Sequence, residues 1–180
     1  MINNLTKTDI EQLIKKYKNS ICKLAYSYLK NMDDVQDAYQ SVFENYFKSM
    51  PQFSNEEHEK AWFLRTTSNV CKNMCTNAWK KRVSVIDNYS NHEPFFVEHK
   101  DTFFELFEEI MKLPYKYRVI IHLFYYEGYP VAEIAKILGI TVSAVKTRLN
   151  RARNMLKKNL LQYYEVSKYY SYTANTCNKV

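Results

Sequence analysis

Glycine is scarce in this chain of 180 residues, which contains only Gly128 and Gly139. Loops that cradle phosphate groups need several closely spaced glycines, because only glycine lets the backbone come close to the anion. The sequence therefore excludes a P-loop and a GxGxxG site. HExxH, GxSxG and CxxC motifs are also missing, and the four histidines lack metal-ligand spacing. We expect a protein that is not an enzyme and that needs no metal or cofactor.

Cysteines and long apolar runs are also few. The four cysteines are too irregular in spacing for a disulfide framework in a chain of this length. Cys71 and Cys75 are one helical turn apart, but no second pair with zinc-site spacing accompanies them, so we interpret them as small core residues. No window reaches the roughly 18 apolar residues of a membrane span, and the N-terminus has no signal-peptide pattern. We expect a cytoplasmic protein without membrane insertion.

Positive charge is in excess, with 26 Lys and Arg against 19 Asp and Glu, a formal charge of +7 and a pI near 9.1. This balance favours a polyanionic partner, either nucleic acid or an anionic membrane surface. Hydrophobic residues make up 46% of the chain, which is enough for packed cores. For this length we expect two small helical modules.

The first half predicts three amphipathic helices, because apolar residues recur there every three or four positions. Thr8 with Glu11 has the pattern of a capping box, and Ser54 with Glu57 has the same pattern. The three helices are expected to cover residues 8–31, 33–50 and 54–82.

The second of these helices has an acidic face. Asp33, Asp37, Gln40 and Glu44 step by four, three and four residues, so they form one stripe opposite the apolar side. A stripe of this kind is unexpected on a basic protein. It is either an ordinary solvated face, which its residues alone favour, or a binding surface.

The third helix carries a stripe of basic and amide side chains beside aromatic residues. Aromatic rings can stack on unpaired bases, amides and guanidinium groups can read base edges, and lysines neutralise phosphates. The combination suits single-stranded nucleic acid, although Trp62 and Trp79 could equally be core anchors. The stripe consists of Arg65, Asn69, Lys72, Asn73, Thr76, Lys80, Lys81 and Arg82.

A linker is predicted at residues 83–100, where the helical period is lost and Asn, Ser and Pro occur. Thr102 with Glu105 has the pattern of a capping box for a helix that stops at Pro114. Another helix is expected from Pro114 to Glu127, with Gly128 as its stop.

A helix-turn-helix motif follows in the segment "VAEIAKILGITVSAVKTRLNRARNMLKK", residues 131–158. Ala135 allows a close helix crossing, Gly139 accepts a left-handed turn, Thr141 caps the second helix and Val145 packs between the helices. The second helix carries no acid. Its N-terminal part would enter the major groove and bring base-facing side chains there, with Lys157 and Lys158 among the phosphate contacts. The base-facing set is Ser143, Lys146, Thr147, Asn150 and Arg151.

These residues resemble bacterial RNA polymerase sigma factors of the extracytoplasmic-function (ECF) subfamily, from about residue 8 to residue 158. The segment "DDVQDAYQSVFENYF" is similar to the family's polymerase-clamp-binding helix, and "KAWFLRTTSNVCKNM" to its minus-ten-reading helix. The most specific match is "LPYKYRVIIHLFYYEGYPVAEIAKILGITVSAVKTRLNRARNMLKK", which is similar to the minus-thirty-five-binding domain. The chain departs from the family pattern at Ser68, where Arg is common.

The resemblance implies an all-α fold of two small helical domains joined by a linker, the second a helix-turn-helix domain. It also implies three partners: core RNA polymerase through its large subunits, promoter DNA and an anti-sigma factor. The residues implied to bind core polymerase are Asp34, Asp37, Gln40 and Glu44. Those implied to bind the melted minus-ten strand are Arg65, Asn69, Lys72, Asn73, Trp79, Lys80, Lys81 and Arg82. Those implied to bind the minus-thirty-five duplex are Ser143, Lys146, Thr147, Arg148, Asn150, Arg151 and Arg153.

The expected division of the chain is a region 2-like domain at 1–82, the linker at 83–100, a region 4-like domain at 101–160 and a Tyr-rich tail at 161–180. A sigma factor would direct core polymerase to promoters. A free-standing helix-turn-helix regulator that binds duplex operators would explain the C-terminal half equally well. The two hypotheses differ because a free regulator should bind its operator without polymerase.

Overall fold

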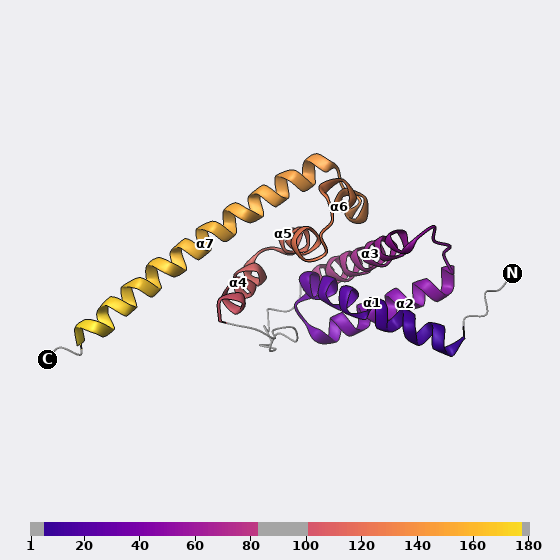
Figure 1. Cartoon of the computed structure of the whole chain (residues 1–180), viewed down its shortest axis with the longest axis horizontal. Coiled ribbons are helices and arrows are strands. Elements are labelled where there is room, and N and C mark those ends of the chain that lie inside the picture. The colour runs from indigo at the N-terminus through magenta and orange to yellow at the C-terminus, as the bar shows by residue number, and fades with distance from the viewer. Residues whose placement is uncertain (1–5, 83–100, 178–180) are drawn as a thin grey trace.

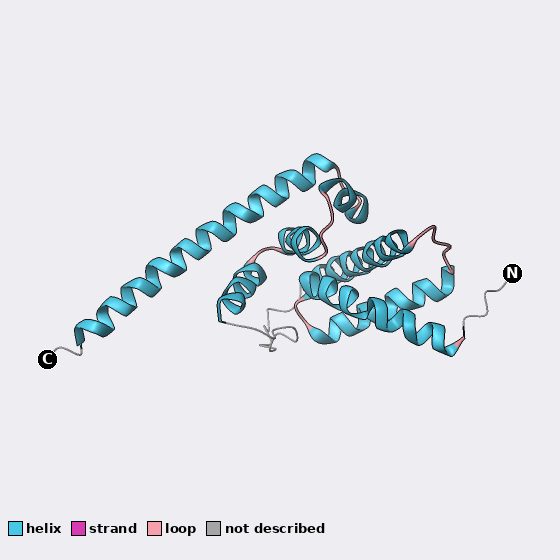
Figure 2. Cartoon of the chain, viewed as in Figure 1, coloured by secondary structure: helices cyan, strands magenta, loops and turns pink. Residues whose placement is uncertain are grey.

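A computed structural model of the chain describes residues 6–82 and 101–177, with side chains described for 6–76 and 106–161. The described residues are helical throughout, with short connections and no strand, which confirms the predicted all-α class (Figure 1, Figure 2). The expected linker, residues 83–100, lies outside the described residues. The elements are α1 (Lys7–Leu29), α2 (Met32–Ser49), α3 (Glu56–Arg82), α4 (Asp101–Lys112), α5 (Tyr115–Ile121), the π-helical turn η1 (His122–Tyr126), α6 (Val131–Leu138) and α7 (Val142–Cys177).

The first helix begins two residues earlier than its predicted capping box. Thr6 is the N-cap: its hydroxyl accepts a bond from the backbone N–H of Asp9, whose carboxylate accepts one from the N–H of Thr6. The assignment to Thr8 and Glu11 is therefore wrong, because Thr6 with Asp9 has the same spacing and chemistry.

Helices α2 and α3 also begin with side-chain oxygen caps, whereas α5 and α6 begin after Pro114 and Pro130 without a side-chain cap bond. Asn31 caps α2 by accepting from the N–H of Asp33 at 2.9 Å. At α3 the cap is Asn55 and not Ser54, since the N–H of His58 donates to the Asn55 side chain at 2.8 Å. The predicted cap of α4, Thr102 with Glu105, falls on side chains outside the described residues.

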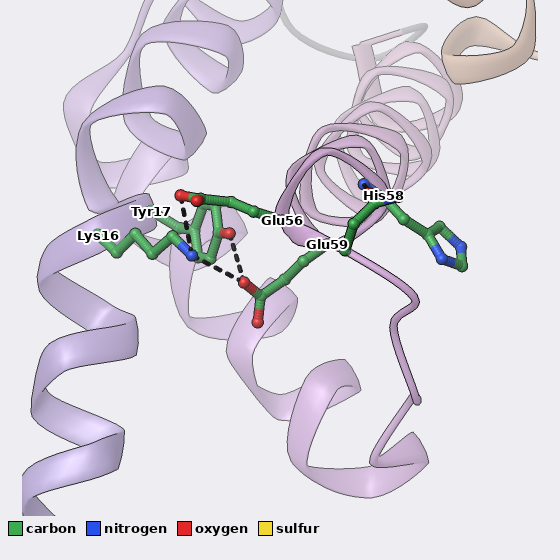
Figure 3. A network of polar contacts seen from close by, with 6 residues as sticks. Lys16, Tyr17, Glu56, His58 and Glu59 are labelled. Carbon is green, nitrogen blue, oxygen red and sulfur yellow. Dashed lines mark hydrogen bonds and ion pairs between the residues drawn. The ribbon is translucent and has the colours of Figure 1, made fainter.

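Helices α1, α2 and α3 form an N-terminal bundle around stacked aromatic rings. Tyr17 of α1 stacks on Phe63 of α3 at 4.4 Å between ring centroids, and Phe43 of α2 packs on the same Phe63 ring. At one end of this bundle, the Tyr17 hydroxyl donates to Glu59 at 2.6 Å, and Lys16 forms an ion pair with Glu59 at 3.0 Å (Figure 3). These contacts hold the first turn of α3 against α1.

The C-terminal bundle, α4 to α7 with η1, contains the predicted helix-turn-helix. Gly139 has φ 65° and ends α6 in the left-handed conformation, while the Thr141 hydroxyl accepts from the N–H of Ala144 and caps α7. Val145 is fully buried, as expected. The single helix expected from Pro114 to Glu127 is instead α5 followed by η1, and its stop at Gly128, with φ 72°, is as predicted.

One hydrophobic core runs through both bundles. The same cluster of buried residues contains Leu24 of α1 and Leu64 of α3 together with Ile120 of α5 and Ile134 of α6. Helices α5 and α6 therefore lie against α1 and α3, while α7 extends away from the rest of the molecule at its C-terminal end (Figure 1). A core of this kind fixes how the two bundles are placed relative to one another.

Candidate nucleic-acid interface

The N-terminal part of α7 presents one buried and one exposed face. Val145, Leu149 and Ala152 are buried at steps of four and three, which seats the helix on α5 and α6. The opposite face is therefore turned to solvent. All five predicted base-facing residues are exposed there: Ser143, Lys146, Thr147, Asn150 and Arg151.

Two predicted phosphate-binding arginines of α7 have more restricted surroundings. Arg148 is half-buried. Arg153 is exposed, but its Nε donates to the Tyr125 hydroxyl at 2.9 Å, and its guanidinium lies over the rings of Phe124 and Tyr125. These contacts orient Arg153 without removing its charge. No local pattern predicted the contact with Tyr125, because it depends on how η1 lies against α7.

The stripe on α3 is exposed only in part. Arg65, Asn69 and Asn73 face solvent, as predicted. Lys72 is half-buried and its Nζ donates to the backbone oxygen of Leu138 at 2.6 Å, so the prediction that it lies on the solvent side is wrong. Burial lowers the pKa of Lys72, and the nearby charge of Arg148 lowers it further. The C-terminal bundle thus covers part of the stripe.

Ser68 lies deeper in the same helix. It is fully buried, and its hydroxyl is 2.6 Å from that of Tyr28 on α1. Burial raises the pKa of the Tyr28 phenol. A side chain in this position joins α3 to α1 and is closed off from any ligand.

Of the two tryptophans of α3, Trp62 lies among the described side chains and Trp79 does not. Trp62 is half-buried and packs edge-on against Phe53, Tyr46 and Phe63, so it is a core anchor. The predicted nucleic-acid-binding side chains Trp79, Lys80, Lys81 and Arg82 fall outside the described side chains, although the helix itself continues to Arg82.

The acidic stripe on α2 is exposed. Asp33, Asp37, Gln40 and Glu44 face solvent, and the neighbouring Asp34 is half-buried. Gln40 donates to Glu44 at 3.1 Å, and Lys48 lies 3.5 Å from the same carboxylate. Asp33 and Asp34 lie in the first turn of α2, where a negative charge is favourable. This face suits a basic partner surface.

A groove of about 970 Å³ lies between the start of α3 and the start of α6. Its walls carry both signs of charge, because Arg65, Lys136, Glu57 and Glu133 are among the lining residues.

No group of three His, Cys, Asp or Glu side chains suited to a metal occurs among the residues that the structure describes. Within those residues, no helix is apolar and long enough for a membrane span.

Each of the two bundles matches a known protein family model. The family model for sigma-70 region 2 matches residues 13–81, and that for sigma-70 region 4 matches residues 103–156. The RNA polymerase sigma factor SigV of Bacillus subtilis is 32% identical over 156 residues, which is 86% of this chain and 93% of that protein. The chain belongs to the ECF sigma factors. It is a sigma factor of transcription initiation.

Other relatives of this sigma factor lie in the same subfamily. The ECF sigma factor SigW of Bacillus subtilis is 28% identical, with 82% of this chain and 87% of that protein covered. Two solved structures share the fold. The sigma factor RpoE of Bartonella quintana, solved with the anti-sigma factor NepR, has a TM-score of 0.66 at 20% identity, covering 84% of this chain and 96% of that one. CnrH, solved with the cytosolic domain of CnrY, has a TM-score of 0.57 at 22% identity, covering 86% and 89%.

Proposed function

We propose that this sigma factor holds core RNA polymerase and promoter DNA at the same time through three separate surfaces. The observation that carries the proposal is the distribution of exposed charge: acidic on α2, basic and amide-rich on α3, and basic without acid on the first turns of α7. An acidic face cannot bind DNA phosphates, whereas the two other faces can. One chain thus offers a protein-binding surface and two nucleic-acid-binding surfaces.

The upstream promoter element is the proposed ligand of α7. Lys146, Asn150 and Arg151 are exposed and would reach base edges in a major groove, with Ser143 and Thr147 beside them. Arg148 and Arg153 would contact phosphates on either side, which fixes the register of the helix without reading sequence. The Arg153 guanidinium lies over the rings of Phe124 and Tyr125, which would orient it for this contact.

The melted minus-ten strand is the proposed ligand of α3. Arg65, Asn69 and Asn73 are exposed and can bind phosphates and base edges. We extend the surface along the helix to Trp79, Lys80, Lys81 and Arg82 on the sequence pattern alone. Lys72 would join the surface only after its bond to Leu138 breaks.

Core polymerase is the proposed partner of α2. Asp37 and Glu44 offer carboxylates, Gln40 lies between them, and Asp34 extends the face toward the start of the helix. Acidic side chains of this kind steer a basic partner surface into place. We propose that the chain acts in the cytoplasm and performs no chemical step itself. We also propose that it is the target of an anti-sigma factor, since one protein of the same fold, RpoE of Bartonella quintana, was solved with such a partner.

A reconstituted transcription assay tests this function. Core polymerase would be incubated with and without the purified chain on a supercoiled library of genomic fragments. We expect specific transcripts only when both are present. Specific binding of the chain alone to a duplex site, without any transcript from the mixture, would instead identify a free-standing helix-turn-helix regulator.

A further inference from the structure

An aromatic side chain continues the acidic stripe of α2. Phe47 follows Glu44 by three residues, so it lies on the same face of the helix as the stripe. Its side chain is 37% exposed, and Met50, the C-cap of α2, is 38% exposed just beyond it. A single exposed apolar side chain on a protein surface needs no explanation. Two of them at the end of a charged stripe make a surface that is acidic along most of its length and apolar at one end.

The Phe47 ring is held by the core beneath it. Between ring centroids it lies 5.3 Å from Tyr46, edge-on, and 6.4 Å from Phe43. Both neighbours are buried, and both pack against Phe63 in the aromatic core of the N-terminal bundle. A side chain that is already restrained in this way loses little conformational entropy when a partner covers it. Phe47 is therefore preorganised for contact with another molecule.

The charged and apolar parts of this surface have different physical effects on binding. Exposed carboxylates such as Asp37 and Glu44 attract a basic partner and speed up the encounter, but each adds little to affinity because water and salt screen it. Binding free energy is concentrated in aromatic and other large side chains that lose all contact with water at the centre of an interface. On this face of α2, Phe47 is the side chain that can supply such an anchor.

The charges around Phe47 select the kind of partner. An exposed ring can also stack on a base, but Glu44 lies one helical turn away and Asp37 lies further along the same face, and both carboxylates repel phosphates. A second copy of the chain is disfavoured too, because a symmetric contact would place one acidic stripe against the other. A basic protein surface with an apolar hollow satisfies both parts. Asp37 and Phe47 are ten residues apart, so the hollow would lie about 15 Å along the helix axis from the first basic contact.

We propose that Phe47, with Met50 at its edge, is the apolar anchor of the α2 surface that binds core RNA polymerase. The polymerase surface that fits α2 has basic side chains facing Asp37 and Glu44 and an apolar hollow that covers the Phe47 ring. The inference rests on the proposed core-binding function of α2. It adds a separation of two roles: the charges set how fast the complex forms, and the ring sets how long it lasts.

Association and dissociation rates of the full chain on immobilised core polymerase test the anchor. Phe47→Ala removes the ring, and Phe47→Gln removes the apolar surface but keeps a side chain of good helix propensity. The matched control is Leu161→Ala, which truncates an exposed apolar side chain of α7 beyond the region 4 match at residues 103–156. We expect both Phe47 variants to dissociate about tenfold faster than the control, with an unchanged association rate and salt dependence.

The charge variant Asp37→Asn with Glu44→Gln should give the complementary result. It should slow association and flatten the dependence of that rate on salt, with a smaller change in dissociation. Phe47 variants that dissociate as slowly as the control would overturn the proposal, and so would Phe47 variants that change only the association rate. Because Phe47→Ala also removes contacts with Tyr46, circular dichroism and urea unfolding accompany it, and Phe47→Gln decides the outcome if that variant is unfolded.

Two further outcomes separate this inference from the proposed function. Failure of the wild type to bind core polymerase would refute the core-binding function of α2 and the anchor with it. Binding of a fluorescent 12-nucleotide single strand by the assembled complex gives the second comparison. Weaker binding of the strand by Phe47→Ala, together with normal dissociation from core, would make Phe47 a stacking residue for bases and would overturn the anchor alone.

Discussion

At the scale of single residues, substitution of Lys146 or Arg151 tests the proposed contact of α7 with the upstream promoter element. Both are exposed on the face of α7 opposite the buried Val145 and Leu149. Changing either to Ala should weaken promoter binding by the polymerase complex by about 1–3 kcal/mol and relax specificity at one base pair, if that side chain reads a base. Lys15→Ala, an exposed lysine of α1, is the control. Titration of labelled promoter variants measures the effect, and wild-type affinity in both variants would show that another face of α7 enters the groove.

Tyr28 and Ser68 provide a residue-scale test of stability. Their hydroxyls pair in a buried position, so removing one leaves the other without its partner. We expect Tyr28→Phe to lower the free energy of unfolding by about 1 kcal/mol, and the double variant with Ser68→Ala to cost less than the sum of the two single changes. Urea unfolding measures this cycle. Strict additivity would mean that the pair does not contribute as a bonded unit.

The exposure of particular residues was predictable only where periodicity alone governs it. The predicted exposure of Lys146 and Asp37 is confirmed, because each lies opposite an apolar face of its own helix. The prediction for Lys72 failed, because the helix covering it is separated from it by more than 60 positions in sequence. Two buried charges were missed for the same reason: Arg118, whose guanidinium donates to backbone oxygens in the last turn of α1, and Glu127, which forms an ion pair with a lysine of α3. No local pattern marks a charged residue that will be buried by a distant helix.

At the scale of elements, Gly139 is the residue on which the helix-turn-helix depends. It has φ 65°, and a Cβ added there would meet nothing within 4 Å. Any cost of substitution is therefore backbone strain and not a steric clash. We expect Gly139→Ala to lower the free energy of unfolding by about 1–2 kcal/mol, and Gly139→Asn to lower it by less, because Asn tolerates the left-handed region. Chemical denaturation tests this order, and equal losses for Ala and Asn would contradict it.

The ends of helices were predicted from the sequence better than their starts. Gly128 and Gly139 end their helices as predicted, because only a left-handed residue allows the chain to turn there. The starts of α1 and α3 were misplaced by one or two residues, since several Thr, Ser and Asn side chains stand near each start and any of them can cap. The π-helical turn η1 has no signal in the sequence that periodicity can detect.

At the scale of the whole molecule, the Lys60–Glu127 contact makes the packing of the two bundles sensitive to acid. The pKa of Glu127 falls from an ordinary value of 4.5 to about 2 in the folded chain. A lowered carboxyl pKa contributes stability that is complete above the ordinary value and is lost as the pH falls toward the folded value. The charged or titratable groups around this carboxylate and its partners are Lys60, His122, Tyr129, Glu57 and Glu133.

We therefore expect the stability of the wild type to fall between pH 4.5 and about 2 more steeply than that of Glu127→Gln. Urea midpoints measured across this range compare the two proteins. Glu133→Gln, which makes the same charge change on a carboxylate that pairs within α6, serves as the control and should follow the wild type. Parallel curves for the wild type and Glu127→Gln would show that the carboxylate is not held by Lys60 and His122 in solution.

The sequence by itself determined the local features of this sigma factor: the helices, the glycine turns, the basic face of α7, the acidic stripe of α2 and the resemblance to sigma regions 2 and 4. Each depends on residues within a few turns of one another, where helical period and backbone conformation decide the outcome. Tertiary structure alone decided how the bundles meet, that Lys72 is covered and that Arg118 bonds to the end of α1. Contacts of this kind depend on the packing of apolar surfaces far apart in the chain, which no local pattern encodes.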